Sequence, residues 1–270
     1  MPSSLHPRLA LNGIVTPGWD VNRSLDYWRS VGLRQGGLMA GTVREYGTDK
    51  FVTAMEQREL RVSSLVCGTF SLDQPSAWPE ERAHLNEMID VAAQLGGIVY
   101  GVSGKGRFDE WQENATRYAE AVAPCVEYGA ARGVTVAFEP SLRPYVSFVH
   151  SLDASIDLAA LSGASIIVDA GNCYAERDVR RRIATLGSRI ALVQLSDVDI
   201  GTLAHPGRCE RTFPGEGELP LGKFVQAACS AGYEGPFEIE FLGPGDVEAD
   251  TVWKSLVYTS DVLDEAIGRS

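Results

Sequence analysis

The chain contains 270 residues, which is typical of one α/β barrel and enough to enclose a large apolar core. Its formal net charge of -12 disfavours a nucleic-acid-binding role, because an acidic surface repels phosphate backbones. No stretch approaches the ~18 apolar residues of a membrane-spanning helix, and the N-terminal segment MPSSLHPRLALNG lacks the apolar run of a signal peptide. We therefore expect a cytoplasmic protein that does not engage a membrane.

Cysteine usage agrees with that location. The sequence has five cysteines and no CxxC pair: Cys67, Cys125, Cys173, Cys209 and Cys229. Their odd number and scattered spacing disfavour both a disulfide framework and a thiolate zinc site. We expect free, buried thiols, as reducing compartments maintain.

Short apolar runs alternate with longer amphipathic segments along the whole sequence. Strand-like runs occur at 9–15, 33–39, 62–68, 97–103, 134–140, 165–171, 190–196 and 236–241. Helix-like stretches lie between them. The clearest, each closed by a glycine, are 79–95, 111–132 and 219–232.

Eight strands that alternate with helices predict the α/β class and a closed parallel (β/α)8 TIM barrel. The alternative is an open doubly wound sheet, which would place a glycine-rich phosphate-binding turn after the first strand. The sequence at that point is TPGWD, which contains no such turn. No linker-like segment or change of composition divides the chain, so we expect one domain over residues 1–270.

Four polar side chains occur where strands of this barrel should end: Glu139, Asp169, Gln194 and Glu240. Each follows apolar strand residues, and a buried carboxylate is costly unless it is paired or bound to a metal ion. A single strand-end carboxylate is often only a helix cap or half of an ion pair. Four oxygen donors on consecutive strands instead indicate a site for a hard divalent cation, at the barrel end where active sites lie.

Several segments resemble a known family: VTVAFEPS, IIVDAGNCY, LVQLSD, RTFPGEGELPL and AGYEGPFEIEF. The sequence is similar to the xylose-isomerase-like barrels, also called the sugar phosphate isomerase/epimerase superfamily. The resemblance implies that Glu139, Asp169, Gln194 and Glu240 bind one divalent ion, with manganese or magnesium expected first and cobalt or zinc as alternatives. It also implies that the two glutamates act as acid and base.

Two positions depart from the pattern of that family. Gln194 stands where most relatives have histidine, although some dehydroshikimate-processing relatives also have glutamine there. Asn172 ends an Asp-Ala-Gly-Asn motif where many relatives have D-x-x-H, so it replaces an imidazole that often touches substrate. A glutamine carbonyl still suits a hard cation, and we therefore expect the metal site to persist.

Other side chains are candidates for binding substrate. By the resemblance, Arg211 reaches into the site, where its planar guanidinium suits carboxylate, phosphate or vicinal hydroxyl groups. His150, Lys105 and Trp19 follow strands five, four and one, where an acid/base group, a cation and an apolar wall would be useful. Lys105 could equally be a surface lysine on a turn, and a capping or packing role is the favoured alternative for His150. Glu238 lies two residues before Glu240, so it should face the same side deeper in the barrel and orient a ligand.

These features indicate an enzyme that moves protons next to a carbonyl of a small carbohydrate-like substrate through an enediolate, as an isomerase or epimerase. A dehydratase-like lyase and a non-catalytic partner in a sugar pathway are the alternatives. A phosphodiesterase is disfavoured, because it would need many histidines and none of the four lies at a predicted strand end. By the resemblance we also expect a homo-oligomer, a dimer or a tetramer.

Overall fold

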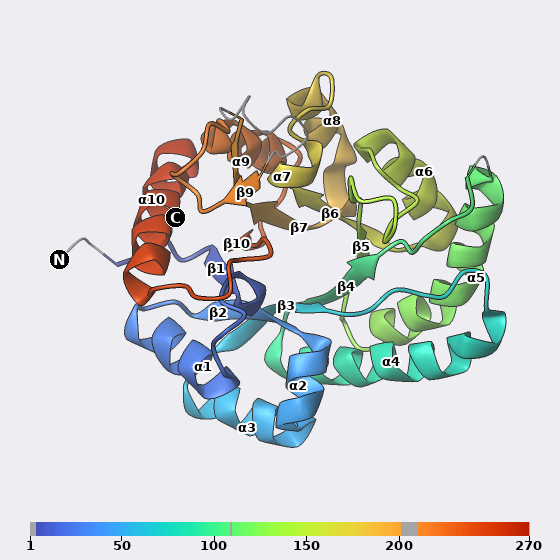
Figure 1. Cartoon of the computed structure of the whole chain (residues 1–270), viewed down its shortest axis with the longest axis horizontal. Coiled ribbons are helices and arrows are strands. Elements are labelled where there is room, and N and C mark those ends of the chain that lie inside the picture. The colour runs from blue at the N-terminus through green and yellow to red at the C-terminus, as the bar shows by residue number, and fades with distance from the viewer. Residues whose placement is uncertain (1–3, 109, 201–209, 270) are drawn as a thin grey trace.

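The computed structural model describes residues 4–108, 110–200 and 210–269. Its main feature is a closed barrel of eight parallel strands, in the order β1, β10, β7, β6, β5, β4, β3, β2 (Figure 1). The strands are β1 (Leu9–Asn12), β2 (Gln35–Met39), β3 (Arg61–Val66), β4 (Ile98–Val102), β5 (Val136–Glu139), β6 (Ser165–Asp169), β7 (Ile190–Leu195) and β10 (Phe237–Ile239). Each strand lies inside its predicted run, except that β3 begins one residue before it. Because β1 pairs with both β2 and β10, the barrel prediction is confirmed and the open sheet is ruled out.

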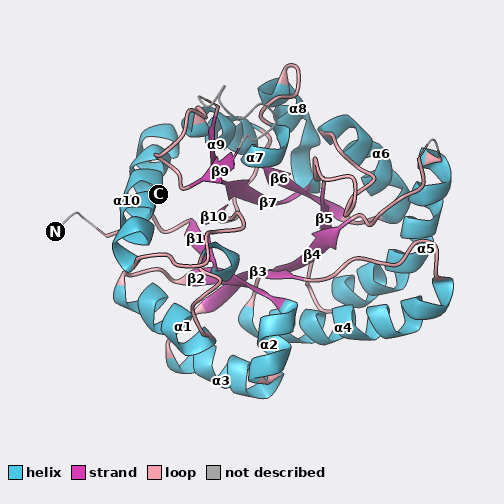
Figure 2. Ribbon diagram, viewed as in Figure 1, coloured by secondary structure: helices cyan, strands magenta, loops and turns pink. Residues whose placement is uncertain are grey.

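Helices form an outer ring around this barrel (Figure 2). They are α1 (Val21–Ser30), α2 (Ala40–Tyr46), α3 (Thr48–Gln57), α4 (Trp78–Leu95), α5 (Trp111–Ala130), α6 (Leu152–Ser162), α7 (Ala170–Cys173), α8 (Val179–Leu186), α9 (Leu221–Ser230) and α10 (Ala249–Ile267). Three short 3-10 helices are η1 (Gly13–Val15), η2 (Pro75–Ala77) and η3 (Gly187–Arg189). No helix in the described ranges is long and apolar enough to cross a membrane.

Helix ends follow from local chemistry, as α6 illustrates. The Ser151 side chain accepts a hydrogen bond from the Ala154 N–H and so satisfies one free donor of the first turn. At the other end Gly163 takes a left-handed conformation and donates its N–H to the Ala159 carbonyl. Glycine also follows α4 and α10, and the one after α4 had marked that helix end in the sequence.

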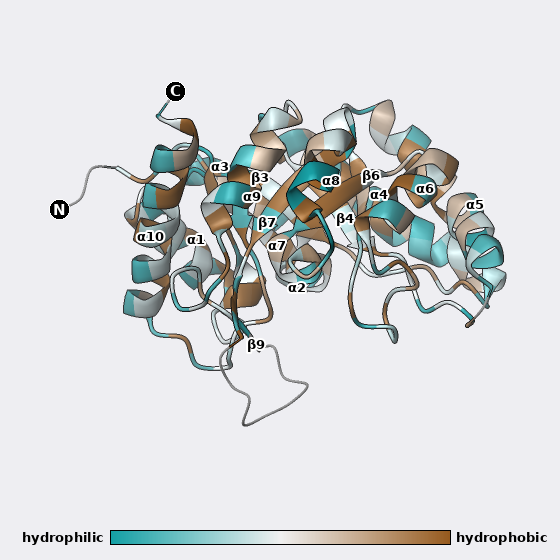
Figure 3. Cartoon of the chain, turned by 90° about the horizontal axis from the view of Figure 1, so that it is seen from above, coloured by the Kyte–Doolittle hydropathy of each residue, from teal (hydrophilic) through white to brown (hydrophobic). Residues whose placement is uncertain are grey.

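The main core lies between the strands and the helix ring, and Figure 3 shows the strands as the more hydrophobic layer. Inside the barrel a smaller apolar cluster comprises Tyr100, Ala137, Ile167 and Leu192. Polar side chains fill other interior positions, including Asn12, Ser64, Gln194 and Glu238, all buried. The interior is therefore packed, and polar residues there need partners within the protein.

A small antiparallel hairpin extends beyond β7 and is absent from the sequence predictions. It consists of β8 (Asp197–Asp199) and β9 (Glu210–Thr212), with Asp197 opposite Thr212. The buried Asp197 carboxylate accepts hydrogen bonds from the N–H groups of Gly215 at 3.1 Å and Leu219 at 2.8 Å, and from its neighbour Val198 at 3.0 Å. These bonds hold the PGEG loop against the hairpin that carries Arg211.

The four cysteines in the described ranges are free thiols, as expected. Cys125 and Cys173 are buried, whereas Cys67 and Cys229 are half-buried, so the expected burial applies to only two. Cys209 lies outside the described residues. Burial raises the pKa of the Cys67 thiol to about 12, which leaves it protonated and unreactive.

Candidate active site

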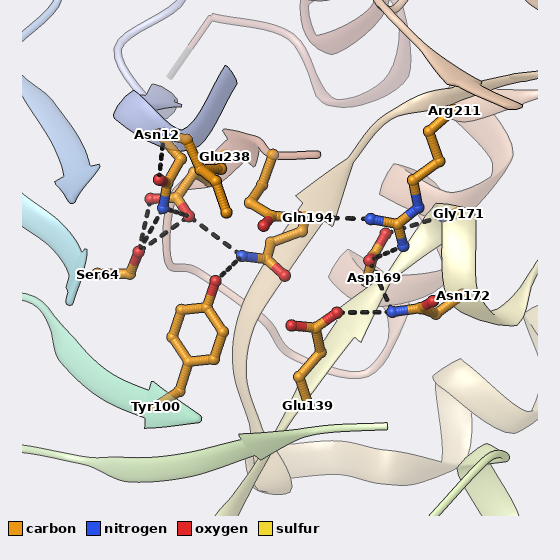
Figure 4. Close-up of polar contacts among 12 residues, drawn as sticks. Asn12, Ser64, Tyr100, Glu139, Asp169, Gly171, Asn172, Gln194, Arg211 and Glu238 are labelled. Carbon is orange, nitrogen blue, oxygen red and sulfur yellow. Dashed lines mark hydrogen bonds and ion pairs between the residues drawn. The ribbon is translucent and has the colours of Figure 1, made fainter. Parts of the chain in front are cut away.

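Four oxygen-bearing side chains lie at the carboxyl ends of four neighbouring strands, and Figure 4 shows three of them: Glu139, Asp169 and Gln194. Glu139 ends β5, Asp169 ends β6, and Gln194 lies in β7 beside Asp169. Glu240 directly follows β10. All four are buried. The structure thus brings together the four residues predicted as metal ligands, while their binding of metal stays a prediction.

Asn172 links two of these carboxylates. Its Nδ2 donates to Glu139 Oε1 at 2.6 Å and to Asp169 Oδ2 at 3.0 Å (Figure 4). Asp169 also caps the short helix α7, because its Oδ1 accepts from the Gly171 N–H at 2.9 Å. The helical turn returns residue 172 over residue 169, since positions three apart share one helix face. The Asp-Ala-Gly-Asn motif is therefore one structural unit at the site.

Arg211 brings a positive charge to the same carboxylates from β9. One guanidinium nitrogen contacts Asp169 Oδ2, and another lies 3.5 Å from Glu240 Oε2. Burial alone lowers the pKa of this guanidinium, but the charges of the three carboxylates raise it by more, so Arg211 stays charged. A side chain at Gly171 would place its Cβ 2.7 Å from Arg211 Nε. Only glycine therefore leaves room for this close approach.

Gln194 is held by a buried network below the carboxylates. Its Nε2 donates to the Tyr100 hydroxyl at 2.7 Å and to Glu238 Oε1 at 3.2 Å (Figure 4). Because both acceptors face the nitrogen, the carbonyl oxygen points elsewhere, and Gln194 Oε1 is buried without a hydrogen-bond partner. The network thus fixes which end of the amide is free to bind a ligand.

Glu238 is the centre of that network. Its carboxylate accepts from Asn12 Nδ2 at 3.1 Å, from the Ser64 hydroxyl at 2.9 Å and from the Ser63 hydroxyl. Burial raises the pKa of Glu238, whereas these hydrogen bonds lower it and offset part of the cost. The sequence predicted its inward position and its role in orienting a ligand. Tyr100, Asn12 and the two serines were not predicted, because their only signal in the sequence was polarity at strand positions.

The carboxylates carry more negative charge than Arg211 balances. Burial and the charge of Asp169 together raise the pKa of Glu240 to about 8, although the Arg211 guanidinium lowers it. Burial also raises the pKa of Glu139, together with the charges of Glu240 and Asp169. A cluster with three carboxylates and one guanidinium favours uptake of protons or of a cation.

The donor chemistry fits a divalent cation. Carboxylate and amide oxygens are hard ligands. Two buried oxygens, Gln194 Oε1 and Glu240 Oε2, have no hydrogen-bond partner among the described residues. Within the described ranges, however, no three His, Cys, Asp or Glu side chains are already grouped as a metal site. Arg211 contacts Asp169 Oδ2, so the guanidinium and a metal ion would compete for that oxygen.

A cavity of ≈ 820 Å³ opens above the cluster. Asn172 and Arg211 form its polar base, and Phe213 and Phe241 pack edge to face beside them with ring centroids 5.0 Å apart. Asn172 and Arg211, both predicted to bind substrate, therefore contact the carboxylates and also line the cavity. The cavity is large enough for an organic ligand, since such sites span roughly 300–1,000 Å³.

The other three predicted substrate-binding residues do not reach this cavity. His150 lines a separate cavity of ≈ 320 Å³ next to Trp111, and its Nδ1 lies 2.7 Å from the Ser141 carbonyl oxygen. Lys105 is exposed on the loop after β4. Trp19 is buried, and its Nε1 donates to the Val247 carbonyl at 3.2 Å, so it supports the loop after β10 from behind. Loop paths, which the strand pattern does not determine, explain these differences.

Comparisons with known proteins agree with this architecture. No curated protein matches the chain. The structure of protein SMc04130 from Sinorhizobium meliloti 1021 has a TM-score of 0.84 and 18% identity, covering 94% of this chain and 98% of that one. The structure of IolI with a bound zinc atom has a TM-score of 0.82 and 14% identity, covering 96% of this chain and 99% of that one. D-psicose 3-epimerase from Clostridium cellulolyticum H10, solved with D-tagatose, has a TM-score of 0.75 and 14% identity, covering 96% of this chain and 98% of that one.

At these identities the structural likenesses show the fold alone. The family model described as "Xylose isomerase-like TIM barrel" matches residues 27–257, which is most of the chain. With its closed parallel barrel and buried strand-end carboxylates, this chain belongs to the xylose isomerase-like TIM barrel family.

Proposed function

We propose that this protein is a divalent-metal-dependent isomerase or epimerase that acts on a sugar-like polyhydroxylated carbonyl compound. The observation that supports this proposal is a pair of buried glutamates, Glu139 and Glu240, with raised pKa values beneath an open cavity. In the barrel, β5 and β10 are separated by β6 and β7, so the two glutamates flank Asp169 and Gln194. A ligand above that centre would have one glutamate on each side.

Proton transfer next to a carbonyl needs a base on one side and an acid on the other. A buried glutamate with a raised pKa is a stronger base than an exposed one when ionised, and it keeps its proton near neutral pH when it must act as an acid. Glu139 would remove or return the proton on one side of the substrate, and Glu240 would do so on the other. Arg211 and Asn172 would bind substrate oxygens from the base of the cavity.

The proposed metal ligands are Glu139, Asp169, Gln194 and Glu240, and the hard oxygen donors favour manganese or magnesium. A bound ion would polarise the carbonyl and hydroxyl oxygens of the substrate and so acidify the carbon between them. Two structural neighbours, IolI with a bound zinc atom and D-psicose 3-epimerase with D-tagatose, are consistent with this proposal.

Solvent exchange tests the proposal. Protein reconstituted with Mn²⁺ is incubated in D₂O with a panel of ketoses, aldoses and cyclic polyol ketones, and deuterium uptake is followed by NMR and mass spectrometry. We expect exchange at a carbon next to a carbonyl, lost in Glu139→Gln and Glu240→Gln and retained in the exposed control Glu218→Gln. Loss of water from the substrate would identify an elimination instead. Wild-type exchange rates in Glu139→Gln with metal still bound would refute the assignment.

A further inference from the structure

The cavity above the carboxylates has polar side chains at its base and a rim that carries both apolar and charged residues. Asn172 and Arg211 contact the carboxylates at its base, Phe213 and Phe241 are buried in its wall, and Leu142 and Leu242 are exposed at its rim. With a volume of ≈ 820 Å³, it lies near the upper end of the roughly 300–1,000 Å³ range that holds drug-sized ligands. A single sugar ring at the base would leave the outer part unfilled.

Two exposed leucines mark that outer part. Leu142 is 51% exposed and lies three residues after Glu139, and Leu242 is 66% exposed and lies two residues after Glu240. Both line the cavity, on the loops that continue β5 and β10. A scattered exposed leucine needs no explanation. Two of them on opposite loops of one cavity, next to an aromatic pair, indicate a surface that an apolar group would cover.

The charges around the opening argue against an anionic ligand group. Outside the Arg211 cluster, the lining contains Glu216, Asp246 and Glu248, opposed by Arg143. Three carboxylates and one guanidinium would repel a phosphate on the outer part of a substrate. The exposed Leu142 and Leu242, together with the aromatic pair, favour an uncharged apolar group at this rim.

We infer that the substrate carries an uncharged apolar substituent, aryl or alkyl, on its sugar-like head group, and that this substituent packs between Leu142, Leu242 and the Phe213–Phe241 pair. The inference rests on the proposed function, which assigns the head group to Glu139 and Glu240. It makes the outer cavity a specificity site that selects apolar-substituted polyols and rejects sugar phosphates.

Matched ligand pairs test this inference by binding alone. D-Glucose, D-galactose and D-xylose are each compared with their phenyl β-glycosides and 1-phosphates, by calorimetry on Mn²⁺-reconstituted protein. We expect at least one phenyl glycoside to bind tenfold or more tightly than its free sugar, because burial of a phenyl ring removes apolar surface from water. We expect the phosphates to bind no better than the free sugars.

Leu142→Asp and Leu242→Asp should abolish the gain from the phenyl group, measured as the ratio of glycoside affinity to free-sugar affinity within each variant. Both positions are exposed, so neither change should harm folding. Leu161→Asp is the matched control, because Leu161 is 49% exposed on α6 and does not line this cavity. Pairs that show no gain from the phenyl group, or a gain that survives in both cavity variants, would overturn the inference.

The outcomes separate this inference from the proposed function. Solvent exchange on free sugars, without tighter glycoside binding, would refute the apolar subsite and leave the proton-transfer function standing. Tighter glycoside binding, with no solvent exchange that requires Glu139 and Glu240, would support the apolar subsite and refute the proton-transfer function. If the leucine variants change the oligomer mass in light scattering and not glycoside affinity, the two leucines belong to an interface between subunits, and the inference fails.

Discussion

Arg211 and a metal ion would compete for the same carboxylate oxygen. The guanidinium contacts Asp169 Oδ2 and approaches Glu240 Oε2 to 3.5 Å. Removing it should leave Asp169 free for a cation and deprive the cluster of the positive charge that contacts it directly. We expect Arg211→Met to bind Mn²⁺ about tenfold more tightly in a calorimetric titration, as the loss of one buried charge competitor would produce. Arg61→Met, exposed at the start of β3, is the control and should bind as wild type does. An unchanged affinity in Arg211→Met would show that the guanidinium does not compete.

Gln194 sets the metal preference if its free oxygen is a ligand. An amide oxygen is a harder donor than an imidazole nitrogen, so the wild type should favour Mg²⁺ and Mn²⁺ more than a histidine site would. Gln194→His should shift the preference toward Zn²⁺ and Co²⁺, measured by competition titration at one pH. Gln194→Met should weaken the binding of all four metals. If all three proteins showed the same preference, residue 194 would not touch the ion.

At the scale of elements, Asp197 connects the hairpin to the PGEG loop. Asp197→Ala would leave three backbone N–H groups without their acceptor, and we expect it to lower the free energy of unfolding by about 3 kcal/mol. Asp197→Asn keeps a carbonyl oxygen for Val198 and Leu219 and loses the bond to Gly215, so it should cost about 1 kcal/mol. Urea unfolding of the two variants measures both values. Equal losses would mean that these hydrogen bonds do not hold the loop.

The sequence predicted the regular elements well because their signals are local. Apolar runs identified all eight strands, and a glycine marked the end of α4. The three-residue strands β8 and β9 were missed because so short a segment has no periodicity. Arg211 was nevertheless expected at the site, through the family-like PGEG loop and not through its own secondary structure.

Interior polar partners and loop positions were harder to predict. The partners of Glu238, such as Ser64 and Asn12, come from strands far apart in sequence, so only the closed barrel shows that they meet. His150 and Trp19 were placed at the site from their positions after strands. In the structure His150 lines a separate cavity and Trp19 is buried in the core. The path of a loop depends on tertiary packing, which a local sequence pattern does not predict.

At the scale of the whole molecule, metal binding should stabilise the barrel. A ligand at 100 times its dissociation constant adds about 2.7 kcal/mol to the free energy of unfolding, which corresponds to a rise of roughly 5–10 °C in Tm. We expect Mn²⁺ to produce this rise and EDTA to reverse it, as followed by circular dichroism. Asp169→Ala should show a much smaller response. A response of wild-type size in that variant would place the stabilising metal elsewhere.

The barrel closes where β1 meets β10, and this seam has a consequence for biosynthesis. Leu9 pairs with Phe237, and Asn12 donates to Glu238, 226 residues further along the chain. Until the ribosome has released β10, the emerging protein must keep two open sheet edges, on β1 and β7, without their partner strand. Such edges are sites of aggregation. A nascent chain stalled after α9 should therefore depend on chaperones far more than the finished chain does.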